Sequence, residues 1–417
     1  MSQQFPKRTA KASQKLLAQA QRVQTNADAE AILKTQSLRN VKNSLWKVNH
    51  SDPHKVLTWD HMHSYSHGLG GKHLWPTIQQ HIKGYEREMA KTIDERAASF
   101  PSDANKLRDI MKILLYIMHN LLTRSSDCAG HALLKAVRIY LNLDMFAAME
   151  THTASTIDRI SDEISTFSSQ IEHLSEFKKD WNFPKMHTHT HMVEDIIEKG
   201  VTQNGNTNVG EGFHRPLKHT YTHHSNFKNV DEQLARYSLY GHAAAIILKR
   251  MHDVDQLNQD EEAEVLEQLA LQNIDSSVVD YKTHTDYLCS APQFYRQPRH
   301  DWVLLDDPEG GLTFAQLIFV FTLSTGKAPG ESPHPFALVL PYSGKVTKAK
   351  RTRDTDLGLW RIRKSSATKI VAISSIICGA LLVPMHEEEE DAIVFDVLDT
   401  NMFVHVRRLS GTLVYFI

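Results

Sequence analysis

Apolar residues between positions 76 and 180 recur at every third or fourth position, which is the spacing of one buried face of an α-helix. Separate patterns of this kind start after Pro76, span residues 105–122, cover about 129–142 and extend over about 144–178. Proline suits the first turn of a helix because the N–H that it lacks is not needed there. The pattern predicts a region that is wholly helical and packs as a bundle.

The pattern changes after about residue 295, where short apolar and β-branched runs alternate with turn-forming residues. Such spacing is typical of strands separated by turns. The runs that we expect to form strands are residues 302–305, 317–323, 336–340, 357–362, 370–377, 380–384, 393–398 and 402–406. They predict a small all-β, barrel-like domain over residues 295–417 and an α+β fold for the whole chain.

The remaining segments differ mainly in charge. Residues 1–36 are a predicted basic arm or helix, which suits either contact with DNA or plain solvation. Residues 37–255 are expected to form a main domain that includes the helical region and a later helix from about 229 to 252. Residues 256–294 are a predicted acidic helical linker. The first 24 positions of the arm contain no acid, and their basic residues are Lys7, Arg8, Lys11, Lys15 and Arg22.

Composition narrows the class of protein. The 417 residues carry a formal net charge of −2, so any affinity for nucleic acid must come from local basic patches. Three widely separated cysteines, Cys128, Cys289 and Cys378, argue against a disulfide scaffold and suit a reducing compartment, the nucleus or the cytoplasm. The longest apolar run, residues 370–384, is too short and too polar to cross a bilayer. With no P-loop or other familiar cofactor motif, we expect neither a membrane nor a small-molecule cofactor as a partner.

Two histidine-rich motifs could carry chemistry. Asp60 and His63 stand three positions apart in Asp-His-Met-His, a spacing that can direct a carboxylate and an imidazole toward one centre on a helix. The alternative is a structural aspartate that caps the helix. His187, His189 and His191 alternate, so on a strand they would share one face and could bind a transition metal. The alternative there is an exposed polar edge.

A third motif combines Glu211 with His214, Arg215 and Lys218. If a helix already runs at Glu211, these side chains share a face; if the helix starts at Pro216, Glu211 lies in the loop before it. A two-metal phosphoryl-transfer site needs several carboxylates around hard cations such as Mg²⁺, and Glu211 could supply one ligand. The cationic residues behind it would then hold DNA phosphates. Taken alone, a glutamate at a helix start is more often a surface residue that the helix dipole favours.

These motifs lie in segments that resemble the fungal Plavaka-type transposases, relatives of the Kyakuja–Dileera–Zisupton group. The resemblance follows the chain in order and covers most of it. Six segments carry it, one of which contains the sequence DHMH and another the sequence EGFHRPLK. These segments are Ser37–Pro76, Met111–Thr123, Val137–Ile157, Asp180–Asn204, Glu211–Val230 and Ile370–Pro384.

The resemblance implies a ribonuclease-H-like catalytic core with a large helical insertion at about residues 76–180, followed by a β-rich tail. It also implies an Asp-Asp-Glu set that binds two Mg²⁺ ions for DNA cleavage and strand transfer. Glu211 matches the last acidic position of that set, and His214, Leu217 and Lys218 match the residues around it. Asp60 and His63 match the Asp-x-x-His element.

In the related arrangement the Asp-x-x-His element follows two catalytic aspartates, whereas the residues before Asp60 include no β-rich run that carries an aspartate. We therefore expect the C-terminal portion of a transposase with an incomplete core, no cleavage activity, and retained DNA binding or self-association. Two alternatives stay open. One is an active Mg²⁺-dependent strand-transfer enzyme that uses Asp60 and Glu211 with another acid, such as Asp52 or Asp195. The other is a helical and β-barrel interaction scaffold without DNA affinity.

Overall fold

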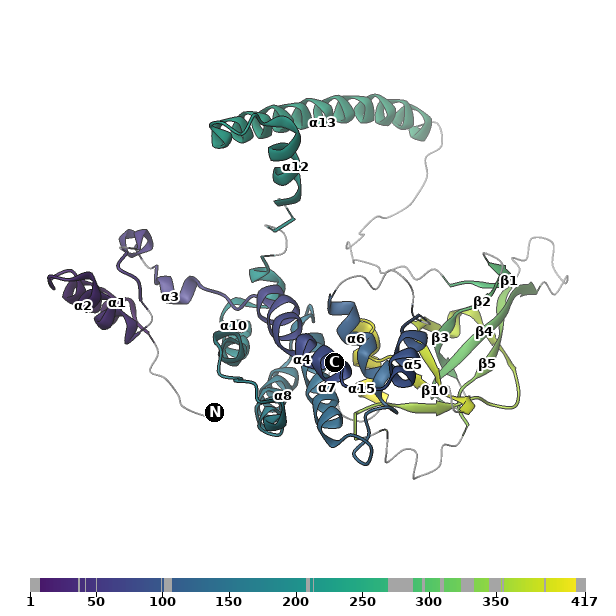
Figure 1. Ribbon diagram of the computed structural model, residues 1–417. Helices are drawn as coiled ribbons and strands as arrows, with labels where there is room; N and C mark the ends of the chain where they lie inside the picture. The colour runs from purple at the N-terminus through teal and green to yellow at the C-terminus, as the bar shows by residue number, and fades with distance from the viewer. Residues whose placement is uncertain are drawn as a thin grey trace. The chain divides into compact units, whose positions relative to one another are not determined.

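The α+β class is confirmed by a computed structural model of the chain, in which the helices come first and small antiparallel sheets follow (Figure 1). Two compact units are present, one formed by Met1–Asn206 with Asp286–Ile417 and the other by Thr207–Thr285. The structure describes residues 8–36, 38–41, 43–49, 51–98, 100, 107–207, 211–212, 214–268, 288–294, 297–307, 311–323, 334–344, 354, 356–385 and 388–409.

The region predicted to be helical is helical. Its central helix α7 (Cys128–Ala147) is buried along most of its length and packs against α6 (Leu107–Met118) and α8 (Ala154–Glu172). The other α-helices described before Asn206 in the first unit are α1 (Ala10–Ala20), α2 (Asn26–Lys34), α3 (Pro53–Val56), α4 (Trp75–Ile82), α5 (Arg87–Ala98), α9 (Pro184–Thr188) and α10 (Met192–Lys199). The 3,4 spacing of apolar residues therefore identified a true buried core.

The boundary between the third and fourth predicted helices differs from the prediction. The long pattern expected from about residue 144 is divided, because α7 continues to Ala147 and α8 begins only at Ala154. A capping box causes the break: the Thr153 hydroxyl accepts a hydrogen bond from the Thr156 backbone N–H at 3.3 Å, and the Thr156 hydroxyl accepts one from Thr153 N–H at 2.9 Å. Such reciprocal bonds satisfy backbone donors that a helix start leaves unpaired.

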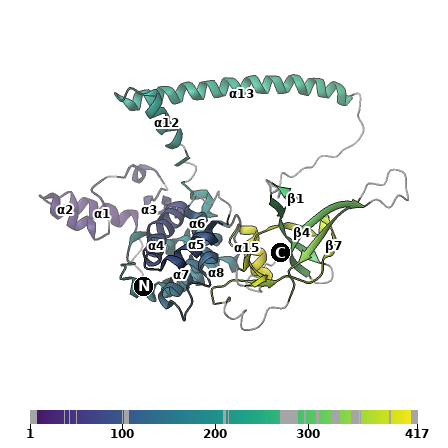
Figure 2. The same cartoon turned by 45° about the vertical axis from the view of Figure 1, so that its right-hand side comes forward.

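A five-stranded antiparallel sheet dominates the C-terminal part, in the order β7-β5-β4-β3-β8. Its strands are β3 (Trp302–Asp307), β4 (Gly311–Leu323), β5 (His334–Pro341), β7 (Lys369–Ala372) and β8 (Ile376–Ala380). The two edge strands, β7 and β8, are joined by the single turn η6 (Ile373–Ser375). Four residue steps reach at most about 14 Å, but the edges of a flat five-stranded sheet lie about 19 Å apart. The sheet must therefore curl, as Figure 2 shows.

The prediction of a barrel is nevertheless wrong in its strict sense. In the described residues β7 pairs with β5 and β8 pairs with β3, but the two edges do not pair with each other, so the sheet stays open. One apolar cluster fills its inner side, and a second joins its outer side to the three-stranded sheet β6-β10-β9 and to helix α15. These elements are β6 (Arg361–Arg363), β9 (Leu382–Met385), β10 (Glu388–Val394) and α15 (Thr400–Leu409), and a separate hairpin pairs β1 (Ser290–Phe294) with β2 (Gln297–His300).

The expected strand at residues 402–406 is a helix, α15. Met402, Phe403 and Val406 lie on its buried face, and the spacing of one and three positions fits a helical turn as well as a strand. Asp399 favours the helix over the strand. Its carboxylate accepts a hydrogen bond from the Met402 backbone N–H at 2.8 Å and caps the helix start.

The second unit contains α12 (His214–His224) and α13 (Val230–Gln268), a single helix of 39 residues in place of the two helices expected there (Figure 1). Among the described residues the first strand of the chain begins at Ser290. The described part of residues 37–255 therefore consists of helices and loops, and the strands of the expected ribonuclease-H-like core are not found in it.

Candidate functional site

Asp60 and His63 lie together, as their spacing predicted. The Asp60 carboxylate accepts a hydrogen bond from the His63 backbone N–H at 3.1 Å and also contacts the His63 ring nitrogen Nδ1. The Asp60 side chain is 14% exposed and that of His63 46%, so the imidazole is the part that solvent or a ligand reaches. The backbone bond is a capping contact, and Asp60 therefore has the structural role that the sequence left open.

The helix that follows Asp60 is a wide π-helix, η2 (Met62–Leu74), which is an uncommon form found frequently at functional sites. Two glycines let it approach its neighbours closely. A β-carbon at Gly70 would lie 2.6 Å from the Tyr140 hydroxyl oxygen, and one at Gly68 would lie 2.7 Å from the side chain of Lys185. Lys185 in turn donates to the His63 carbonyl oxygen at 2.8 Å, so η2 is held against both α7 and α9.

A buried charged group lies beside η2. The Asp144 carboxylate is fully buried on α7 and lies 2.7 Å from the His61 ring nitrogen Nε2 and 3.0 Å from Nε of Arg108. Burial alone would raise the pKa of Asp144, but the charges and hydrogen bonds of His61 and Arg108 outweigh it and hold that pKa at about 2. Sequence reasoning missed this group, although an aspartate inside the apolar pattern of α7 is a signal for a paired buried charge.

The three alternating histidines are helical, which corrects the expected strand. Pro184 opens α9, and the chain continues through η4 (His189–His191), so His187 and His191 are one turn apart on the exposed side, with ring centroids 5.0 Å apart. His189 points the other way and is 1% exposed. Burial, then the charges of His187 and His191, lowers the pKa of His189 to about 4. The shared face of three imidazoles that the zinc hypothesis needed is therefore absent.

Glu211 belongs to the second unit and lies in a helical turn directly before α12. Its backbone N–H donates to the Thr207 carbonyl oxygen at 2.9 Å. The chain is therefore already helical at Glu211, as in the first of the two alternatives that the sequence left open. The Glu211 carboxylate lies 3.5 Å from Nε2 of His214, and Lys218 is exposed one turn further on. The structure thus brings Glu211, His214 and Lys218 onto one helical stretch. Arg215 is part of α12, but its side chain lies outside the described residues.

Asp60 and Glu211 lie in different units. The Asp60 carboxylate contacts the His63 imidazole, and the Glu211 carboxylate contacts the His214 imidazole. The two acids proposed to complete a minimal site have structural contacts: Asp52 caps α3 through the His54 N–H at 2.9 Å, and Asp195 accepts from the Trp59 N–H and from Lys199, both at 2.5 Å. Across the described part of the chain, no three His, Cys, Asp or Glu side chains gather as a metal site would require. Since a two-metal site needs several oxygen ligands close together, the described donors do not fit a pair of Mg²⁺ ions.

The described histidines can instead pair on exposed helical turns. On α12, His219 and His223 have ring centroids 4.5 Å apart, comparable with His187 and His191. Imidazole nitrogen is a softer ligand than carboxylate oxygen. Two imidazoles one turn apart therefore suit Zn²⁺, Cu²⁺ or Ni²⁺ better than Mg²⁺.

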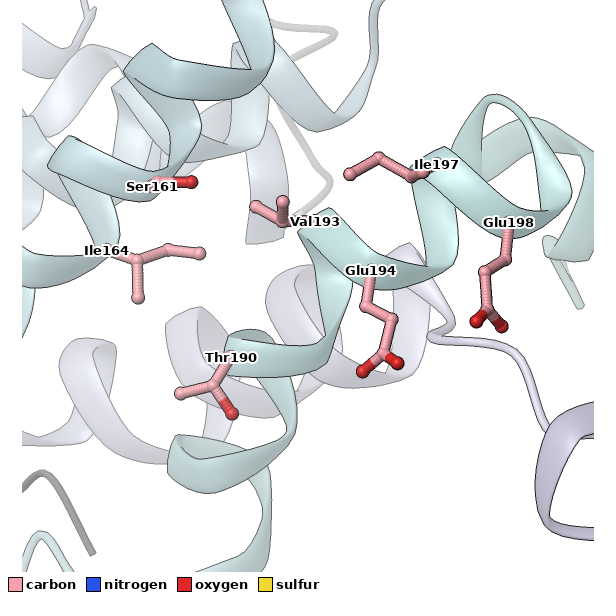
Figure 3. Close-up of a pocket in the computed structure, with 7 residues that line it drawn as sticks. All are labelled: Ser161, Ile164, Thr190, Val193, Glu194, Ile197 and Glu198. Atoms are coloured by element: carbon pink, nitrogen blue, oxygen red, sulfur yellow. The ribbon is translucent and has the colours of Figure 1, made fainter. Parts of the chain in front are cut away.

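A groove of about 450 Å³ lies between α8 and α10 (Figure 3). Ile164, Val193 and Ile197 supply its apolar surface, and Glu194 and Glu198 supply carboxylates on one side. Ser161 and Thr190 complete the lining. An acidic rim repels phosphate, so this groove suits a basic or apolar group and not nucleic acid.

Comparison of the chain with protein-family models, with curated proteins and with solved structures found no match. Among the helices that the structure describes, none is both long enough and apolar enough to cross a membrane.

Proposed function

We propose that this chain is a transposase-derived protein, the C-terminal portion of an Asp-Asp-Glu DNA transposase, that binds DNA without cleaving it. The main support is the short stretch that holds Glu211, His214 and Lys218 on one helical face. The transposase resemblance aligns its last acidic position and the histidine and lysine after it with these residues. The described residues between 76 and 180, where the resemblance expects an insertion, form helices and connecting loops, which adds to this support.

The contacts of the acidic residues support the part of the proposal that concerns the lack of cleavage. Asp60 caps the start of η2, Asp195 pairs with Lys199, and Asp144 is buried between His61 and Arg108. Each of these carboxylates stabilises the fold of the first unit. A carboxylate held in this way would have to leave its partners before it could bind a catalytic metal ion, at a cost of several kcal/mol for the buried one (about 3–5).

Two exposed basic helices are the candidate DNA contacts. On α1 the lysines Lys11 and Lys15 stand one turn apart, both exposed, in a helix that contains no acidic residue. On α12 the exposed Lys218 is followed by the exposed His219, His223 and His224. Exposed lysines of this kind can contact phosphates, which gives affinity that is independent of DNA sequence.

A salt titration tests the proposal. We expect the purified chain to bind a labelled DNA duplex, with an affinity that falls steeply as salt concentration rises. Lys218→Ala and the double change Lys11→Ala/Lys15→Ala should weaken binding and reduce the slope by about one for each lost phosphate contact. Lys91→Ala is the matched control, because Lys91 is an exposed helical lysine that pairs with Glu95. An absence of binding at low salt would overturn the proposal.

The cleavage part of the proposal needs a separate assay. We expect no nicking or strand transfer when supercoiled DNA is incubated with the chain and Mg²⁺. Cleavage that disappears in the Glu211→Gln variant would contradict the proposal and favour an active enzyme. Because this substitution removes only the charge of an exposed residue, it is not expected to affect folding.

A further inference from the structure

Three lysines from three separate segments surround His73, near the end of η2. Lys72 is the residue before His73 on η2, Lys179 follows the short turn η3 (Ser175–Phe177), and Lys185 belongs to α9. Lys72 is exposed, and the other two lysines are partly exposed. We call Lys72, Lys179 and Lys185 the η2 lysine cluster.

Aromatic contacts hold these segments together. The Phe183 ring stacks on the His73 ring, with the ring centroids 3.5 Å apart and an angle of 4° between the planes. The centroids of Trp181 and Phe183 are 6.3 Å apart, and the Lys179 ammonium lies 5.3 Å from the centroid of the Trp181 ring. The segments that carry the lysines are therefore fixed against one another by side-chain packing.

The charges of the cluster act on one another. Burial lowers the pKa of His73 first, and the charges of the η2 lysine cluster lower it further. Burial and then the charge of Lys72 lower the pKa of Lys185, whereas Asp60 opposes this shift. Among the described residues, the charges that act on His73 are all positive. Gathering like charges costs free energy, and an anion that binds between them recovers it.

The neighbouring carboxylates do not cancel the positive charge. The stretch from Lys178 to Lys185 contains three lysines and one acid, Asp180, and η2 contains Lys72 and no acid. Asp180 accepts a hydrogen bond from the Asn182 backbone N–H at 2.8 Å. With Asp60, two acids stand against four lysines, so this face keeps a net positive charge.

The cluster is spread over a surface and does not converge on one point. The Lys179 ammonium lies over Trp181, and the Lys185 ammonium lies at the His63 carbonyl oxygen. A single phosphate ion is typically held where several donors meet, as at a helix N-terminus. A nucleic-acid strand instead presents a row of negative charges, about one every 3.4 Å, which separate cations can contact.

From these observations we infer that the η2 lysine cluster is a further contact surface for the phosphate backbone of nucleic acid. The inference rests on the proposed DNA binding and adds a surface to the basic helices α1 and α12. Contacts to phosphate position a protein on nucleic acid without reading the base sequence. The cluster therefore contributes affinity that depends on salt and is independent of DNA sequence.

A salt titration with the full chain tests the inference. The double change Lys72→Gln/Lys179→Gln removes two charges and keeps much of each side chain. We expect it to weaken binding to a labelled duplex and to reduce the salt slope by about two. Lys185 is left unchanged, because its hydrogen bond to His63 ties α9 to η2.

Lys83→Gln is the matched control and should keep the wild-type slope. Lys83 is exposed at the end of α4, which directly follows η2, and it is not among the described groups whose charges act on His73. If the double variant binds with the wild-type slope, the inference is wrong and DNA binding itself stands. If the wild-type chain binds no DNA at low salt, the proposed function fails and the inference fails with it.

Acetylation of lysines in the wild-type chain provides a second readout that needs no variant. A DNA duplex should protect Lys72 and Lys179 from the reagent and leave Lys83 as reactive as before, as measured by mass spectrometry of the digested chain. Protection that is confined to lysines of α1 and α12 would overturn the inference and leave the proposed function intact.

Discussion

Arg138 and Asp396 form a two-pronged ion pair between helix α7 and the segment after β10, with Nη1 to Oδ1 at 2.8 Å and Nη2 to Oδ2 at 2.5 Å. The side chains are only 5% and 4% exposed, and the Tyr116 hydroxyl donates to the same carboxylate at 2.9 Å. The pair joins residues 258 positions apart, so it ties the helical part of the first unit to its strands.

We expect Asp396→Ala to lower the free energy of unfolding by about 3–5 kcal/mol, because it leaves the Arg138 guanidinium buried without its counter-charge. Urea denaturation monitored by circular dichroism measures the change. Glu172→Ala, at the exposed end of α8, is the control and should change stability by less than about 0.5 kcal/mol. Equal effects of the two changes would show that the pair does not tie the parts together.

As the pH falls, the protonation of His189 should lower the stability of the first unit. Burial and the neighbouring histidines lower the pKa of His189 from 6.5 to about 4, so the unfolded chain binds the proton more readily than the folded one. The stability that depends on a neutral His189 is complete above pH 6.5 and is lost as pH falls toward 4, by about 3 kcal/mol in all. Replacing His189 by Leu should flatten unfolding free energy against pH in this window, whereas replacing the exposed His67 by Leu should leave the slope unchanged.

A second and lower pH window belongs to Asp144. Although burial opposes ionisation, His61 and Arg108 hold the Asp144 pKa at about 2, below its ordinary value of 3.8. The corresponding stability is present above about pH 4 and is lost as pH falls toward 2, by about 2 kcal/mol. Asp144→Asn should be less stable than wild type at pH 7, with a smaller loss between pH 4 and pH 2. A variant that keeps the wild-type acid slope would refute the assignment.

The narrow contact between η2 and α7 makes Gly70 sensitive to a single methyl group. Gly70→Ala would place a β-carbon 2.6 Å from the Tyr140 hydroxyl oxygen, so we expect a loss of about 1–3 kcal/mol from overpacking. At Gly84 the nearest atom would be 3.4 Å away, and Gly84→Ala is therefore the control. Thermal unfolding of both variants provides the measurement, and a Gly70→Ala variant as stable as Gly84→Ala would contradict the packing argument.

The sequence predicted what depends on local periodicity and missed what depends on distant partners. The buried stripe of α6 could be read directly from the spacing of its apolar residues. The His187–His191 segment was read with a period of two, although Pro184 was a local sign that a helix begins there. The contacts of Asp144 could not be foreseen, because its partners His61 and Arg108 lie 83 and 36 positions away and only the folded chain brings them together.

Short apolar runs were the other source of error. The run at residues 402–406 fits either a strand or a helix, and only the capping contact of Asp399 distinguishes them. For the candidate site, the sequence correctly placed Asp60 beside His63 and Glu211 beside His214. The sequence overestimated the number of carboxylates that are available as metal ligands. The carboxylates around Asp60 have structural partners that a single sequence does not reveal.

The three-residue turn η6 gives the C-terminal sheet a particular vulnerability. Because Ile373–Ser375 connects the strands at both outer borders, one backbone cut there would remove the restraint on both at the same time. Each freed border would expose a row of unpaired N–H and C=O groups on β5 and β3, and such rows recruit strands from other chains. Proteolysis at this one turn would therefore replace the short borders β7 and β8 with the longer strands β5 and β3, from which the sheet could aggregate on two sides.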